Sequence, residues 1–283
     1  MKAKTAFSKK DLVVVLGCIA FLLANIAAVG KGGRNRAKQL VCLANLRQLG
    51  GAWLTFAQDN DGKLVNGDVP AKYSRYNPEK FWVEPPVNEV GLYVGEMSFC
   101  TFKDEKRGIE RGLLLPYLKN TNIYHCPADD RYTRRPGDPR HLKKDGGFRS
   151  YSIAGCLNGE EGVNQNNYNI TLYSQIKSPA DKYVFVEEGD PRGYNRGSWI
   201  LQAVDNLNIW DWTDPVAAWH NKQCALGFSD GHAEMHKWLD QRTIKLATTE
   251  DWNIIRMIRK GQFNNPDLVY MKKHYAHKGK MGN

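Results

Sequence analysis

An apolar run without charge at residues 12–30 continues, with no proline, into an amphipathic segment at residues 36–56. At about 1.5 Å of rise per residue, a helix over the run is long enough to cross a hydrocarbon layer. In the second segment the apolar residues recur at steps of four and three, which places them on one helical face: Cys42, Leu46, Leu49, Trp53 and Phe56. We therefore expect one stalk helix over residues 7–60, with residues 12–30 in lipid or a filament core and the second part against a protein core.

Three glycines separate the two parts of this predicted helix: Gly30, Gly32 and Gly33. A glycine weakens a helix by about 1 kcal/mol relative to alanine. The sequence therefore predicts a hinge or a melted turn at this point.

The residues before the apolar run carry a processing pattern. Ala6 stands directly before Phe7, and Asp11 is the fifth residue counted from Phe7. The pattern resembles the processing site of type IV prepilins and of the pseudopilins of type II secretion. The resemblance implies that a prepilin peptidase removes residues 1–6, that Phe7 becomes an N-methylated amino terminus, and that Asp11 pairs with the Phe7 ammonium group of a neighbouring subunit. The alternative is an uncleaved signal anchor.

Three further motifs follow in order along the chain. A Cys-x-x-Asn-Leu-x-Gln-Leu segment covers residues 42–49, a Cys-Pro-x-Asp element covers residues 126–129, and His220 is followed after nine residues by Asp230 and Gly231. Together with the amino-terminal pattern, they resemble prepilin-like proteins that carry an H-x9-D-G signature. The resemblance implies a structural subunit and not an enzyme, which assembles through its helix with the help of a secretion or pilus assembly machinery. It also implies a single pass through the inner membrane before assembly, with the globular part periplasmic or extracellular.

The residue pattern in the second half of the chain predicts β-strands. Residues 150–154 and 182–187 have the composition of strands. The clearest element is a hairpin, in which residues 224–228 and 233–238 flank an Asp-Gly turn. We expect these strands to form an antiparallel sheet.

The expected fold is α+β and pilin-like, with a long membrane-inserted amino-terminal helix packed on an antiparallel sheet that carries large loops. Its parts are a leader at residues 1–6, the stalk helix at residues 7–60, a globular head at residues 61–270 and a basic tail at residues 271–283. We expect the tail to be disordered, because chain ends without apolar anchors are poorly ordered.

Alternation along the second arm of the hairpin places His232, Glu234 and His236 on one face. Two imidazoles and a carboxylate are suitable ligands for zinc or another divalent metal ion, and His220 and Asp230 would complete the shell. Three acids at the end of the preceding strand could reach the same end of the sheet: Glu187, Glu188 and Asp190. The alternative is that Asp230 shapes the turn, that His220 bonds a backbone group, and that Glu234 and His236 lie on a solvated face.

The chain has six cysteines and no C-x-x-C pair, which gives no support to a zinc ribbon or a thioredoxin-like motif. Cys18 lies in the apolar run, where we expect a free thiol. Among the other five we predict a disulfide between Cys42 and Cys126, which would attach the stalk helix to the head.

The net charge of +10 and the isoelectric point near 9.2 invite a nucleic-acid interpretation, but the cations are scattered and no nucleic-acid motif is present. We therefore expect no nucleic-acid partner. A second hypothesis is a membrane-tethered extracytoplasmic module that binds a metal or a carbohydrate and does not polymerise. Carbohydrate binding would use aromatic faces beside carboxylates, which the last third of the chain supplies: Trp199, Trp210, Trp212, Trp219 and Trp238 with Asp205, Asp211 and Asp214. A third is a surface protein with a vestigial processing site.

Overall fold

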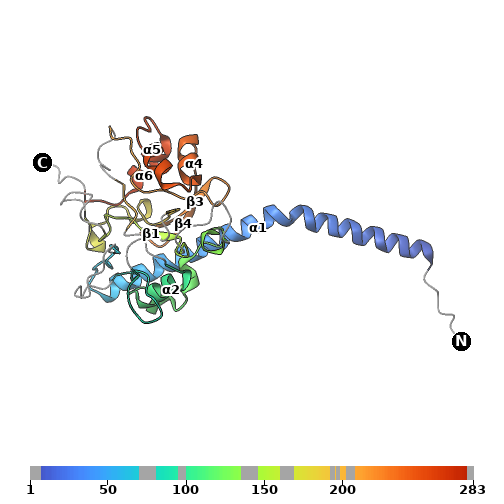
Figure 1. Ribbon diagram of the computed structural model, residues 1–283, viewed down its shortest axis with the longest axis horizontal. Helices are drawn as coiled ribbons and strands as arrows, with labels where there is room; N and C mark the ends of the chain where they lie inside the picture. The colour runs from blue at the N-terminus through green and yellow to red at the C-terminus, as the bar shows by residue number, and fades with distance from the viewer. Residues whose placement is uncertain are drawn as a thin grey trace.

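The computed structural model describes residues 8–69, 81–94, 100–134, 146–159, 169–191, 195, 198–201 and 208–278, with the backbone alone for residues 23–29 and 31. One helix of 51 residues, α1 (Lys9–Asp59), dominates the molecule. Its first half projects from the head as a straight stalk, and its second half lies within the head (Figure 1). The predicted processing residues Ala6 and Phe7 lie outside the described residues.

A capping box starts α1. The backbone N–H of Asp11 donates to Oγ of Ser8 at 3.3 Å, and the N–H of Ser8 donates to Oδ2 of Asp11 at 3.0 Å. These bonds satisfy two of the backbone donors that a helix start leaves unpaired. The helix ends where Asp61 and Gly62 take left-handed backbone conformations, with φ of 56° and 79°. The predicted boundaries of the stalk helix are therefore confirmed to within two residues.

The predicted hinge is wrong, because α1 continues through Gly30, Gly32 and Gly33 without a break. The Nε–H group of Arg34 donates to the carbonyl of Gly30 at 2.7 Å and spans this part of the helix. In the part of the chain that the structure describes, no helix is long and apolar enough to cross a membrane. The apolar run predicted to do so, residues 12–30, includes residues 23–29, whose side chains lie outside the described part.

The head is built on an antiparallel sheet in the order β1 (Tyr151–Ile153), β2 (Tyr183–Glu187), β3 (Gln223–Phe228) and β4 (Ala233–Lys237). All three predicted strand regions are confirmed, and the predicted hairpin is β3–β4, in which Leu226 pairs with Glu234. The combination of helices with an antiparallel sheet confirms the α+β class.

The second half of α1 packs on β3 and β4. Leu46, Leu49 and Trp53 have no exposed surface, as the periodicity of this segment predicts. Glycines allow a close approach: a Cβ atom on Gly227 of β3 would lie 3.5 Å from the Leu46 side chain. The apolar face of α1 thereby forms one wall of the core.

Shorter helices complete the head: α2 (Phe102–Arg111), α3 (Leu115–Leu118), α4 (Gln241–Thr248), α5 (Trp252–Ile258) and α6 (Pro266–His274), with the 3-10 turns η1 (Thr121–Tyr124), η2 (Arg131–Thr133), η3 (Tyr173–Gln175) and η4 (Pro179–Asp181). In Figure 1, α4, α5 and α6 gather on one side of the sheet and α2 lies on the other. The core is therefore enclosed from both sides.

The carboxyl-terminal segment differs from the disordered tail predicted for residues 271–283. Residues 271–274 close α6, and Met271 and Tyr275 are fully buried. The hydroxyl of Tyr275 accepts the N–H of Cys156 at 3.2 Å and donates to the carbonyl of Trp199 at 3.3 Å. Disorder is therefore wrong for residues 271–278, because two apolar anchors hold them to the core. Residues 279–283 lie outside the described part.

Candidate functional site

Four side chains that could ligate a metal meet in the interior of the head: Cys42, Cys126, Glu187 and His220. All four are buried, and one donor atom from each lies within 4.8 Å of the other three. Oε1 of Glu187 lies 2.8 Å from Sγ of Cys42 and 3.1 Å from Nε2 of His220. Nε2 of His220 lies 3.2 Å from Sγ of Cys126. Two sulfurs, a nitrogen and an oxygen form a donor set that could hold a metal ion.

The four ligands come from four different parts of the chain. Cys42 is the first buried residue along the described part of α1, and Glu187 is the last residue of β2. His220 precedes β3, and its N–H donates to the carbonyl of Gln223 at 3.3 Å across a turn. Residues 221–222 make this turn in left-handed conformations, with φ of 55° and 63°. The group therefore forms only when α1 is docked on the sheet.

Hydrogen bonds from the surroundings orient the ligand side chains. The N–H of Ala225 donates to Oε2 of Glu187 at 2.8 Å, which leaves Oε1 directed at the other three donors. The hydroxyl of Tyr151 lies 3.1 Å from Sγ of Cys42, and the N–H of Ala128 donates to Sγ of Cys126 at 3.4 Å. Outer hydrogen bonds of this kind hold ligands in position in metal sites.

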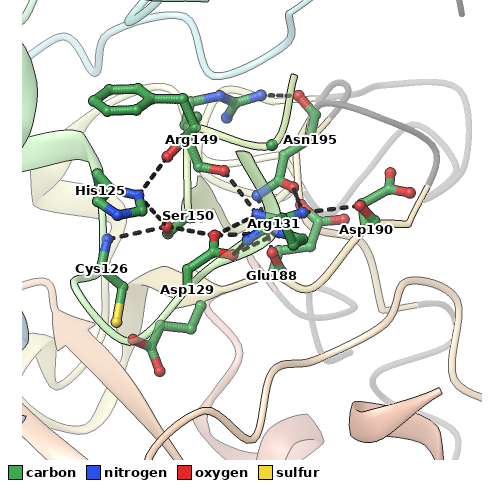
Figure 2. A network of polar contacts seen from close by, with 12 residues as sticks. His125, Cys126, Asp129, Arg131, Arg149, Ser150, Glu188, Asp190 and Asn195 are labelled. Carbon is green, nitrogen blue, oxygen red and sulfur yellow. Dashed lines mark hydrogen bonds and ion pairs between the residues drawn. The ribbon is translucent and has the colours of Figure 1, made fainter. Parts of the chain in front are cut away.

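The loop that carries Cys126 is held by Ser150 (Figure 2). The Ser150 hydroxyl accepts the N–H of Cys126 at 3.0 Å and donates to Oδ2 of Asp129 at 2.7 Å. The side-chain amide of Asn45, one turn after Cys42 on α1, donates to the carbonyl of His125 at 2.9 Å. The Cys-Pro-x-Asp loop is thereby bonded both to the sheet and to the stalk helix.

Arg131 anchors the far end of this loop in a buried polar network (Figure 2). Its guanidinium donates to both carboxylate oxygens of Asp129, at 2.9 Å and 2.8 Å. It also donates to the carbonyls of Asp190 at 2.8 Å and Arg149 at 3.0 Å, and to Oδ1 of Asn195 at 3.1 Å. Burial lowers the pKa of Arg131, but the contacts with Asp129 outweigh burial and raise it. The guanidinium is therefore a permanently charged centre of the network.

Burial and mutual contacts shift the pKa values of Cys42 and His220. It raises the pKa of Cys42 well above its usual range, and the neighbouring Cys126 and Glu187 raise it further. Burial alone would lower the pKa of His220, but contacts with Cys126 and Glu187 outweigh it and raise this pKa to about 10. Burial and the neighbouring groups therefore favour the neutral Cys42 thiol, and the contacts of His220 favour its imidazolium form.

No family model, curated protein or solved structure matches this chain. The arrangement of its own residues therefore carries the functional argument. Each of the three motifs in the sequence supplies one residue of the group, in the first position of the motif: Cys42, Cys126 and His220. That shared position is the signal from which the group could have been predicted. Arg131 and Ser150 lie in no such pattern, and nothing in their sequence context predicts their contacts.

The structure does not assemble the metal shell that the sequence predicts from His220, Asp230, His232, Glu234 and His236. Among the described residues, the only group of this kind joins His220 to Cys42, Cys126 and Glu187. His220 and Asp230 lie at opposite ends of β3, a strand of six residues. Such a strand spans roughly 20 Å, so the H-x9-D-G spacing separates these two side chains.

The four hairpin residues of the predicted shell have other partners. Nδ1 of His232 lies 2.6 Å from Oδ1 of Asp230 on the surface. The ring of His236 stacks on Tyr270 with 3.9 Å between ring centroids, and the Tyr270 hydroxyl donates to Oε1 of Glu234 at 3.0 Å. Asp230 shapes the turn and Glu234 is exposed, as the alternative for these residues proposed. His236 differs from it, because its side chain packs against Tyr270 of α6 and is only 13% exposed. Of the three nearby acids, Glu187 alone joins His220 in the group.

The two cysteines of the predicted disulfide are brought together, but both are free thiols in the structure, as is the exposed Cys18. Trp199, Trp212 and Trp238 do not form a surface for stacking on a carbohydrate, because all three are buried. The indole N–H of Trp238 donates to the carbonyl of Ala217 at 2.8 Å. These rings close the core. Asp205 lies outside the described residues.

Proposed function

We propose that this chain is a prepilin-like structural subunit, which assembles through the projecting half of α1 into a type II secretion pseudopilus or a pilus-like surface filament. The observation that carries the proposal is the exposure of consecutive apolar side chains on the stalk. They include Leu12, Val13, Val14, Val15, Leu16, Ile19, Phe21 and Leu22, with 42–70% of their surface exposed. Consecutive apolar residues face all sides of a helix, and a helix that is apolar all round is buried in its working state.

Lipid before assembly and neighbouring stalk helices after assembly are the environments that would bury these side chains. The first belongs to a single-pass state in the inner membrane, with the head on the periplasmic or extracellular side. The second requires many copies of the chain, with Asp11 as a partner for the amino terminus of a neighbouring copy. Asp11 is exposed in the first turn of α1, where its carboxylate also accepts the N–H of Ser8.

The first test is the mass and methylation state of the amino-terminal peptide, measured on protein from the host's membrane and sheared-surface fractions. The proposal expects a chain that begins at N-methylated Phe7. A chain that begins at Met1 would contradict processing by a prepilin peptidase and would favour the membrane-tethered module that does not polymerise.

The second test uses Cys18, the one exposed cysteine of the six. Bis-maleimides of increasing length, applied to the surface fraction, should join pairs of copies through Cys18 into covalent dimers. Cys18→Ser should abolish the dimer. Val14→Lys should also abolish it, because a lysine would be buried without a partner among neighbouring stalks. The matched control is Leu239→Lys, since Leu239 is equally apolar and 65% exposed on the head. A dimer band that survives Val14→Lys would contradict assembly through this helix.

A further inference from the structure

We propose that Cys42, Cys126, Glu187 and His220 bind a structural zinc ion, which fixes the stalk helix to the head. The sequence predicted metal binding at the hairpin, whereas this site lies in the core and includes a residue of α1. The proposal does not depend on filament assembly, because a zinc ion here would act within one chain.

The donor set selects the metal. Two thiolates favour a thiophilic ion, and the imidazole and the carboxylate are both common zinc ligands. Structural zinc sites are four-coordinate and closed to solvent, and these four residues are all buried. Calcium and magnesium are disfavoured, because both require oxygen ligands in larger number.

The distances leave room for an ion after a small adjustment. In a tetrahedral site with Zn–S of about 2.3 Å and Zn–N or Zn–O of about 2.0 Å, neighbouring donor atoms lie roughly 3.3–3.8 Å apart. Three donor pairs of the group lie 2.8 Å, 3.1 Å and 3.2 Å apart. Ligand movements of about 0.5 Å would therefore open the tetrahedron, which is within the freedom of side-chain rotation.

The ligand charges exceed the charge of a divalent ion by one. As zinc ligands, Cys42 and Cys126 would be thiolates, Glu187 a carboxylate and His220 a neutral imidazole. With the ion, the site has a net charge of −1. Three donors already face it: the hydroxyl of Tyr151 and the N–H groups of Ala128 and Ala225. Such bonds stabilise thiolate and carboxylate ligands.

The place of the site gives the ion a mechanical role. Cys42 marks the point where α1 enters the head, since residues 32–38 before it are exposed and Leu46 and Leu49 after it are buried. The other three ligands belong to the sheet and its loops. A zinc ion would therefore join the stalk to three separate parts of the head at the first buried turn of the helix.

The experiment measures metal in the full-length chain, purified in detergent with a reductant, equilibrated with Zn²⁺ and dialysed exhaustively. We expect about one zinc ion per chain by elemental mass spectrometry. Co²⁺ in place of Zn²⁺ should give thiolate-to-metal charge-transfer bands and the intense visible bands of a tetrahedral site. Both readouts use the unaltered chain, so they do not depend on how well a variant folds.

Variants assign the ion to these residues. Cys126→Ala and His220→Ala should lose the zinc, while Cys156→Ala, which removes an equally buried thiol outside the group, should keep it. Tyr151→Phe removes only the hydroxyl beside Cys42 and should weaken zinc binding by about 10–100-fold. Near-ultraviolet circular dichroism of the buried tryptophans reports whether each variant is folded.

Three results would overturn the proposal. The first is a folded chain that takes up neither zinc nor cobalt under reducing conditions. The second is zinc that stays bound in a folded Cys126→Ala variant. The third is a Cys42–Cys126 disulfide, found by peptide mapping, in metal-free protein isolated from the host without reductant.

Discussion

Gly50 of α1 and Gly231 of the β3–β4 turn lie so close together that a Cβ atom on Gly50 would be 3.2 Å from the Cα atom of Gly231. The neighbouring Gly51 faces the other way, and a Cβ atom there would meet nothing within 4 Å. Gly231 itself has φ of 92°, a backbone conformation that residues other than glycine rarely adopt. Two glycines thus allow the stalk helix to rest directly on the hairpin backbone.

Alanine at these two neighbouring helix positions should have different effects. Gly51→Ala should raise the free energy of unfolding by about 0.5–1 kcal/mol, because alanine favours the helix. Gly50→Ala gains the same preference but pushes α1 away from the turn, so it should be less stable than Gly51→Ala by about 1 kcal/mol or more. Denaturant unfolding followed by tryptophan fluorescence measures both. Equal stability of the two variants would show that the contact with Gly231 tolerates a methyl group.

The buried ion pair between Arg131 and Asp129 should be the most sensitive polar contact in the head. Arg131→Met leaves the Asp129 carboxylate buried without its cation, so the free energy of unfolding should fall by about 3–5 kcal/mol. Adding Asp129→Leu removes the stranded charge and should restore part of the loss. Arg242→Met is the control: Arg242 pairs with Asp240 on the surface, and its loss should cost about 1 kcal/mol or less. A double variant less stable than Arg131→Met would contradict this explanation.

The sequence predicted those parts of the molecule that local patterns encode. The steps of four and three after residue 36 placed Cys42, Leu46 and Trp53 on the buried face of α1, and the Asp-Gly turn located the β3–β4 hairpin. Local preference failed at the three glycines in α1, where the helix continues in spite of a cost of about 1 kcal/mol each. Propensity is a weak guide when one residue is judged apart from the rest of its helix.

The candidate site could be predicted only in pieces. His220 and Asp230 are near in sequence and were grouped on that basis, but a straight strand separates them. Cys126 and His220 are 94 residues apart and lie 3.2 Å from each other, because the sheet and α1 bring them together. Contacts of this kind depend on tertiary packing, which the spacing of residues in the sequence does not encode.

Glu105 of α2 is a buried carboxyl that receives three backbone hydrogen bonds. The N–H of Gly147 donates to Oε1 at 2.8 Å, and the N–H groups of Phe148 and Arg149 donate to Oε2 at 2.6 Å and 2.9 Å. Burial raises the pKa of Glu105 from 4.5 to about 7, although the backbone donors act in the opposite direction. The folded chain therefore binds a proton here more tightly than the unfolded chain does.

This raised pKa should make the head more stable as the pH falls through the range from about 7 to about 4.5. The contribution to stability is complete below the pKa that Glu105 has in the unfolded chain. It is lost as the pH rises through the pKa that Glu105 has in the folded chain, and its size is on the order of 3 kcal/mol. Glu105→Gln should lower stability at every pH and remove this dependence, whereas Glu110→Gln, at an exposed position of α2, should leave it in place. Unfolding curves measured across this range provide the comparison. A parallel dependence in wild type and Glu105→Gln would contradict the assignment.

Asn45 should be the residue of α1 that is least tolerant of a change from amide to carboxylate. Its Nδ2 group donates to the carbonyl of His125 at 2.9 Å, beside Cys126, and 8% of its surface is exposed. Asn45→Asp keeps the shape but sets a buried carboxylate against a carbonyl oxygen, so the free energy of unfolding should fall by about 2–3 kcal/mol. Gln48→Glu makes the same change on the exposed side of the helix and should be nearly neutral, because Gln48 bonds only the carbonyl of Ala44.

The loss caused by Asn45→Asp should depend on pH in a direction that identifies its cause. The new carboxyl can donate to the His125 carbonyl only when it is protonated, so folding raises its pKa above the ordinary value. The folded variant then binds more protons than the unfolded one, and its deficit relative to wild type should shrink as the pH falls toward the pKa of an ordinary aspartate. A deficit that is constant with pH would point to a packing defect. It would mean that the amide-to-carbonyl bond contributes little to holding the stalk helix on the Cys126 loop.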